Sequence, residues 1–162
     1  MHKPSVFTKE RMIYWPGEFS DVVDLLNGRD QNGSMVSVPL YSLNTGPILL
    51  AAAIGAREKR TRETKTDNRK EISTATFHSN GLEMYIFLIP ILANIALGTE
   101  FLRPENEEQV IREFERYVAG GLEYLAGEME ASAGKSADII VQSLMMKKIT
   151  TTNTLGDLPS LI

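Results

Sequence analysis

Residues 57–70 (REKRTRETKTDNRK) are the one stretch of the sequence whose residue types indicate a binding chemistry. Seven cationic side chains stand there against three acidic ones, and no apolar side chain interrupts them. Cations at this density can neutralise several phosphates and give salt-sensitive, sequence-independent nucleic-acid binding. An acidic partner protein is an equally suitable ligand. A solvated loop, or one folded onto the acidic part of the same chain, is the alternative without a binding role. The candidate contact residues are Arg57, Lys59, Arg60, Arg62, Lys65, Arg69 and Lys70.

Known catalytic motifs are absent from the sequence. It has no phosphate-binding loop, no dinucleotide-binding glycine pattern, no zinc-protease motif and no serine-hydrolase elbow. The tripeptide 63–65 has the Glu-x-Lys spacing of some nucleases, but it lies in the least core-like stretch. Glu105, Glu107 and Glu108 are candidate cation ligands, although the helix dipole also explains acids in a first helical turn. We therefore assign no catalytic residue, no metal and no cofactor, and keep a small metal-dependent nuclease as an alternative.

Residues 84–97 (MYIFLIPILANIAL) are apolar on every side and predict the centre of the core. A helix that is hydrophobic all round either spans a membrane or lies inside a globular protein. Because a membrane span takes about 20 apolar residues, this shorter run predicts a buried helix with a kink at Pro90. A strand over 83–88 followed by a helix from Pro90 is the alternative. In both cases Leu92→Ala or Ile95→Ala should cost about 2–5 kcal/mol of stability.

Further helices are predicted before and after this stretch. Asn44 to Pro47 is a good helix start, and the alanine-rich helix that follows is expected to pack on residues 84–97. Apolar residues at three- and four-residue steps predict a long amphipathic helix over about 105–131. Gly120 and Gly121 in its middle indicate a close helix crossing, a bend or a break. Other predicted elements are helices over 21–27 and 137–148, and short strands over 6–15, 35–38 and 72–77.

The predicted fold class is mainly α. We expect a compact domain of about five helices around the buried helix 84–97, with minor short β elements. Residues 1–148 should form this single helical domain, in which the basic segment 57–70 is a mobile loop or a solvated helical extension. Residues 149–162 should form a flexible C-terminal tail.

The composition favours some cellular locations and some classes of partner over others. With no cysteine there is no disulfide, which suits a reducing compartment, and the first residues do not resemble a signal peptide. We expect a cytoplasmic protein without a membrane partner. The net charge of −4 argues against a general nucleic-acid coat. Charge is nevertheless separated along the chain, because residues 100–132 carry nine Glu against three Arg.

Several pieces of the sequence, in one order, resemble a known family. TGPILLAAAIGARE, a charged segment, the apolar stretch and EEQVIREFERYVAGGLEYL resemble the DNA phosphorothioation-associated protein 4 family over about residues 35–130. Members of that family are small proteins encoded beside bacterial systems that place sulfur in the DNA backbone and use it in defence against foreign DNA. The resemblance implies a role in phosphorothioate-linked modification or restriction. It supplies neither a reaction nor catalytic residues.

The function inferred from the sequence is that of a non-enzymatic accessory protein of such a system. Its expected partners are other proteins of the modification or defence complex, with DNA as a further candidate. A structural oligomer built through the helix of Gly120 and Gly121 is the remaining alternative. Three or more carboxylates clustered in a cleft would favour the nuclease, whereas a broad apolar patch on the outside would favour a protein that acts by interaction.

Overall fold

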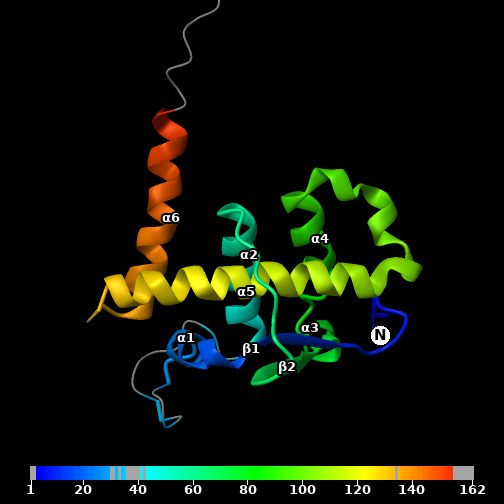
Figure 1. The fold of residues 1–162 in the computed structure, drawn as a ribbon, viewed down its shortest axis with the longest axis horizontal. Coiled ribbons are helices and arrows are strands. Elements are labelled where there is room, and N and C mark those ends of the chain that lie inside the picture. The colour runs from blue at the N-terminus through cyan, green and yellow to red at the C-terminus, as the bar shows by residue number, and fades with distance from the viewer. Residues whose placement is uncertain are drawn as a thin grey trace, which may run out of the picture.

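A computed structural model describes residues 3–29, 32, 34, 35, 41, 43–133 and 135–154 of the chain (Figure 1). Short 3-10 helices join the main elements at Gly17–Phe19, Ile95–Leu97, Thr99–Leu102 and Pro104–Asn106. The prediction of a mainly α fold with minor β structure is confirmed. The main elements are, in order, β1 (Met12–Pro16), α1 (Ser20–Leu26), α2 (Thr45–Arg57), β2 (Arg69–Ser73), α3 (Thr74–Ser79), α4 (Met84–Ala93), α5 (Glu107–Ala131) and α6 (Ala137–Thr154).

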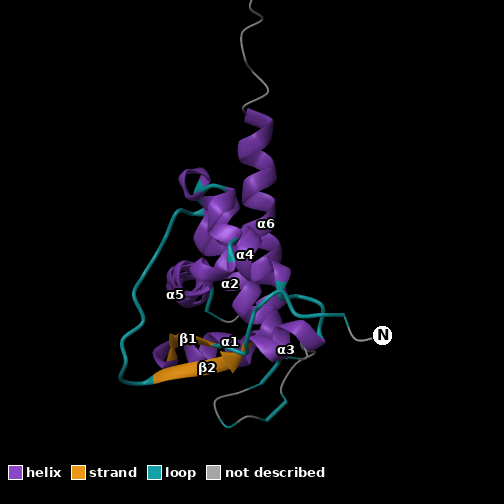
Figure 2. Ribbon diagram, turned by 90° about the vertical axis from the view of Figure 1, so that its right-hand side faces the viewer, coloured by secondary structure: helices purple, strands orange, loops and turns teal. Residues whose placement is uncertain are grey.

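Helix α5 is the axis of the fold. Its apolar side chains recur every three or four residues and therefore share one face of the helix. That face is fully buried, as the 0% exposure of Val110, Phe114, Val118, Leu122 and Leu125 shows. Helix α2 crosses α5, and α4 and α6 stand on one side of it. Helices α1 and α3 and the two strands lie on the other side (Figure 1 and Figure 2).

The prediction that residues 84–97 are the buried centre is wrong. A helix does form there, not the alternative strand, but α4 buries only one face, which includes Ile86 and Phe87. Leu92 is 76% exposed, and Ile95, in the turn after the helix, is 87% exposed. Their replacement by Ala removes little buried surface, so the expected loss of about 2–5 kcal/mol does not apply. The longer amphipathic helix α5 occupies the centre instead.

The two strands form a small antiparallel ribbon. Ile13 pairs with Ile72 and Trp15 with Lys70, and burial of Ile13 and Trp15 fixes the ribbon to the core. The predicted strand 72–77 is correct only at its beginning. From residue 74 onward the chain is helical, because the Ser73 hydroxyl oxygen accepts a hydrogen bond from the Ala75 backbone N (3.0 Å) and caps α3.

Other boundaries also differ from their predicted positions. Strand β1 covers only the end of the predicted strand 6–15. The predicted strand 35–38 lies, apart from Met35, outside the described residues. Helix α1 begins at Ser20, whose hydroxyl donates to the Gly17 carbonyl instead of capping the helix. Helix α6 continues beyond residue 148 to Thr154, and residues 155–162 of the predicted tail lie outside the described part.

Helices α2 and α5 cross with their backbones packed directly together. A Cβ atom at Gly121 would lie 1.7 Å from the Ala51 carbonyl oxygen, and one at Gly55 would lie 2.1 Å from the Tyr117 carbonyl oxygen. Cβ atoms in proteins essentially never approach within 3.0 Å. Helix α5 runs unbroken through both glycines, so the predicted break is wrong, and the close crossing accounts for them. Helix α2 touches α4 as well, but it packs chiefly on α5.

Gly121→Ala is expected to destabilise the protein by about 1–3 kcal/mol, the usual cost of forcing extra atoms into a packed interior. Gly127→Ala is the matched control on the same helix, because nothing lies within 4 Å of its added Cβ. Its better helix propensity should raise stability by about 0.5–1 kcal/mol. Urea unfolding of both variants measures the two effects. Equal changes in the two variants would contradict a tight crossing.

Candidate functional site

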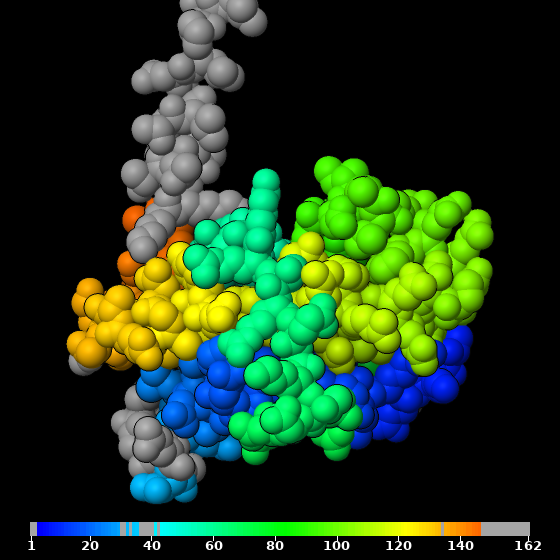
Figure 3. Space-filling view, viewed as in Figure 1, coloured from blue at the N-terminus to red at the C-terminus, as the bar shows by residue number. Residues whose placement is uncertain are grey.

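The basic segment forms an extended strap, residues 58–68, that runs from the end of α2 across α5 to β2. Figure 3 shows the strap lying over one face of α5. The Arg62 backbone N donates to the Arg116 carbonyl oxygen (3.1 Å), and a Cβ at Gly120 would lie 2.3 Å from the Arg60 carbonyl oxygen. Residues 58–68 are therefore a loop and not the helical extension that was the other expectation. The strap folds onto the acidic helix of its own chain.

Arg62 is held by partners from several parts of the fold. Its guanidinium forms ion pairs with Glu18 and, at 3.2 Å, with Glu123 of α5. It also lies 5.1 Å from the centre of the Phe19 ring, within cation–π range. These interactions connect the strap to both α5 and the turn that follows β1.

Three further arginines are engaged within the chain. Arg60 lies over the ring of Tyr124 at 5.2 Å, and Arg69, in β2, lies over the ring of Tyr14 at 3.7 Å. Arg57, at the end of α2, donates to a backbone carbonyl oxygen of α6 (3.1 Å). These side chains hold elements of the fold together, so a phosphate ligand would have to compete with their existing partners.

The three lysines of the segment are placed differently. Lys59, Lys65 and Lys70 are exposed, and among the described residues none of their side chains has an ion pair, hydrogen bond or ring contact. The structure thus divides the predicted contact residues into four arginines that stabilise the fold and three lysines that point to solvent. The second group is the part of the segment that is open to a ligand.

The acids considered for metal chemistry make other contacts. Glu63 of the Glu-x-Lys tripeptide pairs with Arg116 (Oε1–Nε 2.9 Å). Glu105 and Glu108 are exposed, and Glu108 lies 3.4 Å from the Arg11 guanidinium. Nowhere in the described ranges do three His, Cys, Asp or Glu side chains come together in a group that could hold a metal ion.

Two buried glutamates fasten the N-terminal segment. Glu107 is 2% exposed, and its carboxylate accepts hydrogen bonds from Thr8 N (2.7 Å) and Arg11 Nε (2.9 Å). Glu83 is held similarly and lies 2.7 Å from His78 Nδ1. Burial disfavours the charged forms, yet these partners hold the pKa of both carboxyl groups below the usual value. Glu107, a candidate cation ligand in the sequence, is therefore bound by its own chain.

Glu115 is a titratable site that sequence reasoning missed. It projects from α5 toward the ribbon, where its carboxylate accepts a hydrogen bond from Tyr14 N (2.8 Å). Burial raises its pKa to about 7, and the Tyr14 bond and the charges of Arg69 and Arg112 only partly oppose this shift. In the sequence Glu115 is one acid among nine, and nothing local distinguishes it.

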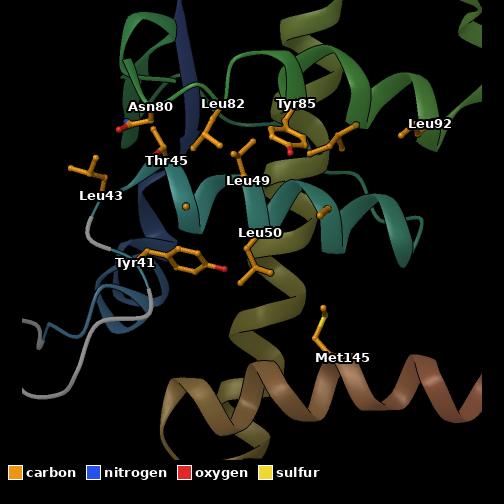
Figure 4. Close-up of a pocket in the computed structure, with 13 residues that line it drawn as sticks. Tyr41, Leu43, Thr45, Leu49, Leu50, Asn80, Leu82, Tyr85, Leu92 and Met145 are labelled. Atoms are coloured by element: carbon orange, nitrogen blue, oxygen red, sulfur yellow. The ribbon is translucent and has the colours of Figure 1, made fainter. Parts of the chain in front are cut away.

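An apolar groove of about 980 Å³ opens between α2, α4 and α6 (Figure 4). Its polar groups are few, and Asn80 and Thr45 lie together at one end, away from Leu92 (Figure 4). Tyr41 and Met145 approach from the side opposite α4. Such a surface can bind a complementary apolar surface, with two or three polar groups to orient it. The apolar lining comes mainly from Leu43, Leu49, Leu50, Ala53, Leu82, Tyr85, Ile89, Leu92 and Met145.

Sequence reasoning did not find the groove. Its lining comes from segments around residues 41–53, 80–92 and 145, which only the fold brings together. The sequence nevertheless contained one indication of the groove. Residues 84–97 are apolar on every side, but the prediction placed all of these side chains in the core. Several of these side chains instead face outward, including Tyr85 (48% exposed).

The fold and this groove define a mainly helical protein with an exposed apolar groove on its surface. The chain belongs to the DNA sulphur modification system-associated protein 4 family, whose sequence model matches residues 20–158. The resemblance drawn from residues 35–130 is thereby confirmed over a longer range. No curated protein and no solved structure matches the chain. The family description makes it an accessory protein of a DNA sulphur modification system. Across the described residues, every helix is too short or too polar to cross a bilayer.

Glu115→Gln is expected to stabilise the protein above about pH 7. A carboxyl group whose pKa is raised by folding contributes stability that is complete below its unfolded pKa of 4.5 and is lost as the pH rises through about 7. The amide keeps an acceptor for Tyr14 N and does not titrate. The melting temperature of the variant should therefore exceed that of the wild type at about pH 8 and approach it at about pH 5. A difference that is independent of pH would contradict this assignment, and Glu130→Gln, exposed on the same helix, is the control.

Proposed function

We propose that the protein is a non-enzymatic accessory component of a bacterial DNA sulphur modification or restriction system, and that it acts by binding a partner protein in the apolar groove. The groove is the single observation that carries this proposal. Membership of the family supports the choice of occupant, because it links the chain to the proteins of that system. The occupant is an apolar helix or loop of one of those proteins.

The exposure of the groove lining supports a protein partner. Leu43, Tyr85, Leu92 and Met145 are each between 47% and 76% exposed. Large apolar side chains that gather on a surface are typical of interaction sites, since covering them removes apolar area from water. A gain of roughly 25 cal/mol per Å² makes such a face favourable to cover. A broad apolar patch on the outside was expected to favour a protein that acts by interaction, and the lining of the groove is such a patch.

Contact with DNA is a second proposal, carried by the three uncommitted lysines. Lys59, Lys65 and Lys70 lie on and beside the strap and are open to phosphate. Three cations provide a weak, sequence-independent attraction rather than specific recognition. The arginines contribute less, because their guanidinium groups already have partners in the chain.

Ala53→Glu is expected to abolish partner binding without unfolding the protein. Ala53 is exposed on α2 and lines the groove, so a carboxylate there would be buried by an apolar partner at high cost. The measurement is co-purification of the tagged chain with each neighbouring modification or restriction protein, co-expressed one at a time. Leu102→Glu is the control, because Leu102 is 45% exposed and lies outside the groove. Equal capture by wild type and Ala53→Glu would refute the groove proposal.

Replacement of Lys59, Lys65 and Lys70 by Ala should leave thermal stability nearly unchanged, yet weaken any DNA binding. The slope of log affinity against log salt should fall in magnitude by about 0.9 for each phosphate that the variant no longer neutralises. Arg62→Ala is the comparison: it should lower stability by about 1 kcal/mol, because it removes two ion pairs and the interaction with the Phe19 ring. Fluorescence anisotropy with duplex DNA, with and without phosphorothioate, measures the binding. No affinity of the wild type at low salt would refute the DNA proposal.

A further inference from the structure

A polar pocket, distinct from the apolar groove, lies between the strap, the ribbon and α5. Figure 2 shows the strap as the loop that runs past α5 to β2. The pocket has a volume of about 230 Å³, far more than the roughly 10–15 Å³ that a single water molecule needs. Its charged lining consists of three arginines and two glutamates, namely Arg69 of β2, Arg112, Arg116 and Glu115 of α5, and Glu63 of the strap. The pocket is therefore large enough for a small ligand and carries more positive than negative groups.

Two residues that line the pocket have a buried polar atom without a hydrogen bond. Thr64 Oγ1 and Arg116 Nε are shielded from solvent, and neither has a hydrogen-bond partner among the described residues. Arg116 Nε lies 2.9 Å from Glu63 Oε1, but its N–H is not aligned to donate to that oxygen. Buried polar groups in folded proteins nearly always have a partner, which can be protein, water or an ion. Because a hydroxyl and an Nε–H can both donate, one ligand with acceptor oxygens can serve both atoms.

Positive charge at the pocket is only partly neutralised. Arg116 forms ion pairs with two glutamates. Arg112 is exposed, and its side chain has no ion pair or hydrogen bond among the described residues. Arg69 likewise has no ion pair there, and its guanidinium stacks on the ring of Tyr14. Arg69 and Arg112 both attract the Glu115 carboxylate, but one carboxylate cannot neutralise two cations. The pocket therefore favours an anionic ligand.

We propose that this pocket binds a small oxyanion of the phosphate class, either free phosphate or the terminal phosphate of a small molecule. Thr64 Oγ1, Arg116 Nε and the Arg112 guanidinium donate hydrogen bonds to its oxygens. Arg69 adds positive charge while its stacking on Tyr14 stays in place. Charge-assisted hydrogen bonds from guanidinium groups are a common means of holding phosphate oxygens. A volume of about 230 Å³ is too small for a double helix, so this site is distinct from the lysines proposed to contact DNA.

Glu115 makes the binding dependent on pH. Its Oε1 accepts the hydrogen bond from Tyr14 N (2.8 Å), whereas its Oε2 has no hydrogen bond among the described residues. Burial raises the pKa of this carboxyl group to about 7. Below that pH the neutral group can donate from Oε2 to the anion, and above it the carboxylate repels the anion. The affinity is therefore expected to fall as the pH rises through about 7.

The other charged groups that face Glu115 come from all the elements around it. Within the pocket they are Glu63, Arg69 and Arg112, of which only Glu63 adds to the effect of burial. A neighbouring depression, which Glu115 also lines, contributes two further cations and two further acids, namely Lys9, Arg11, Glu10 and Glu108. Because these four charges offset one another, they add little net field at the pocket.

Isothermal titration calorimetry of the full chain with inorganic phosphate and with sulfate tests the proposal, against chloride at the same ionic strength. We expect one saturable site per chain at about pH 6, and a melting temperature that rises with anion concentration. Arg112→Ala should weaken the affinity at least about tenfold, the equivalent of one charge-assisted hydrogen bond. Thr64→Val should also weaken it, because a methyl group cannot donate. Arg103→Ala removes an exposed arginine outside the pocket and is the matched control.

Sulfate is the probe for the pH dependence, because a phosphate group itself titrates with a pKa of about 6. Sulfate affinity should fall between about pH 6 and about pH 8 in the wild type and stay constant in Glu115→Gln. An equal fall in this variant would overturn the role of Glu115. Tighter binding of a nucleoside monophosphate than of phosphate would support the terminal phosphate of a small molecule as the ligand, and weaker binding would support free phosphate.

Three results would overturn the inference. One is the absence of saturable binding of either anion by the wild type at about pH 6. Another is an unchanged affinity in both Arg112→Ala and Thr64→Val. The third is displacement of sulfate by duplex DNA at equal ionic strength, since the ligand would then be a DNA phosphate and not a small anion. Each of these results leaves the groove proposal intact, because the groove and the pocket share no lining residue.

Discussion

The close backbone packing of α2 on α5 is the constraint on which the rest of the structure depends. At Gly55 and Gly121 no side chain separates the two helices, so the carbonyl oxygens of Tyr117 and Ala51 pack directly against these glycines. With α2 held this close, its outer side forms the floor of the groove and its end directs the chain into the strap. The strap in turn passes over Gly120, where a side chain would exclude it. Because these elements are close-packed, the position of each one fixes the position of the next.

Many of the charged side chains described above form ion pairs, hydrogen bonds or ring contacts within the chain. The basic strap lies on the acidic helix, where Arg62 bridges Glu18 and Glu123. Partly exposed pairs of this kind contribute little individually, but together with stacked rings they fix an extended segment that has no apolar side chain of its own. The buried carboxylates of Glu83 and Glu107 do the same for the N-terminal segment. Within the basic segment, Lys59, Lys65 and Lys70 are the residues whose side chains have no such partner among the described residues.

Helices α4 and α6, which line the groove together with α2, lie on the side of α5 away from the ribbon (Figure 1). An exposed apolar surface can bind another protein, which suits an accessory protein of a DNA sulphur modification system. The groove there has its few polar groups at one end.

Some features were determined by the sequence alone, because they depend on neighbours along the chain. The three- and four-residue spacing from Val110 to Leu125 defines a helix and its buried face, and capping and proline signals placed the start of α2 at residue 45. The family was likewise recognisable from contiguous segments. Local signals were less reliable at residues 72–77, where one capping hydrogen bond converted a predicted strand into a helix.

Other features were decided only by the tertiary structure. The sequence shows that residues 84–97 avoid water, but burial of one face depends on which helix reaches it, and α5 covers only the side of Ile86 and Phe87. The groove joins residues up to about a hundred positions apart, from Tyr41 to Met145, and no local pattern encodes such a meeting. The conformation of the basic segment likewise depends on how close the fold brings it to the acidic helix α5. Electrostatic attraction and apolar burial act through space, so the sequence supplies the groups while the fold selects their partners.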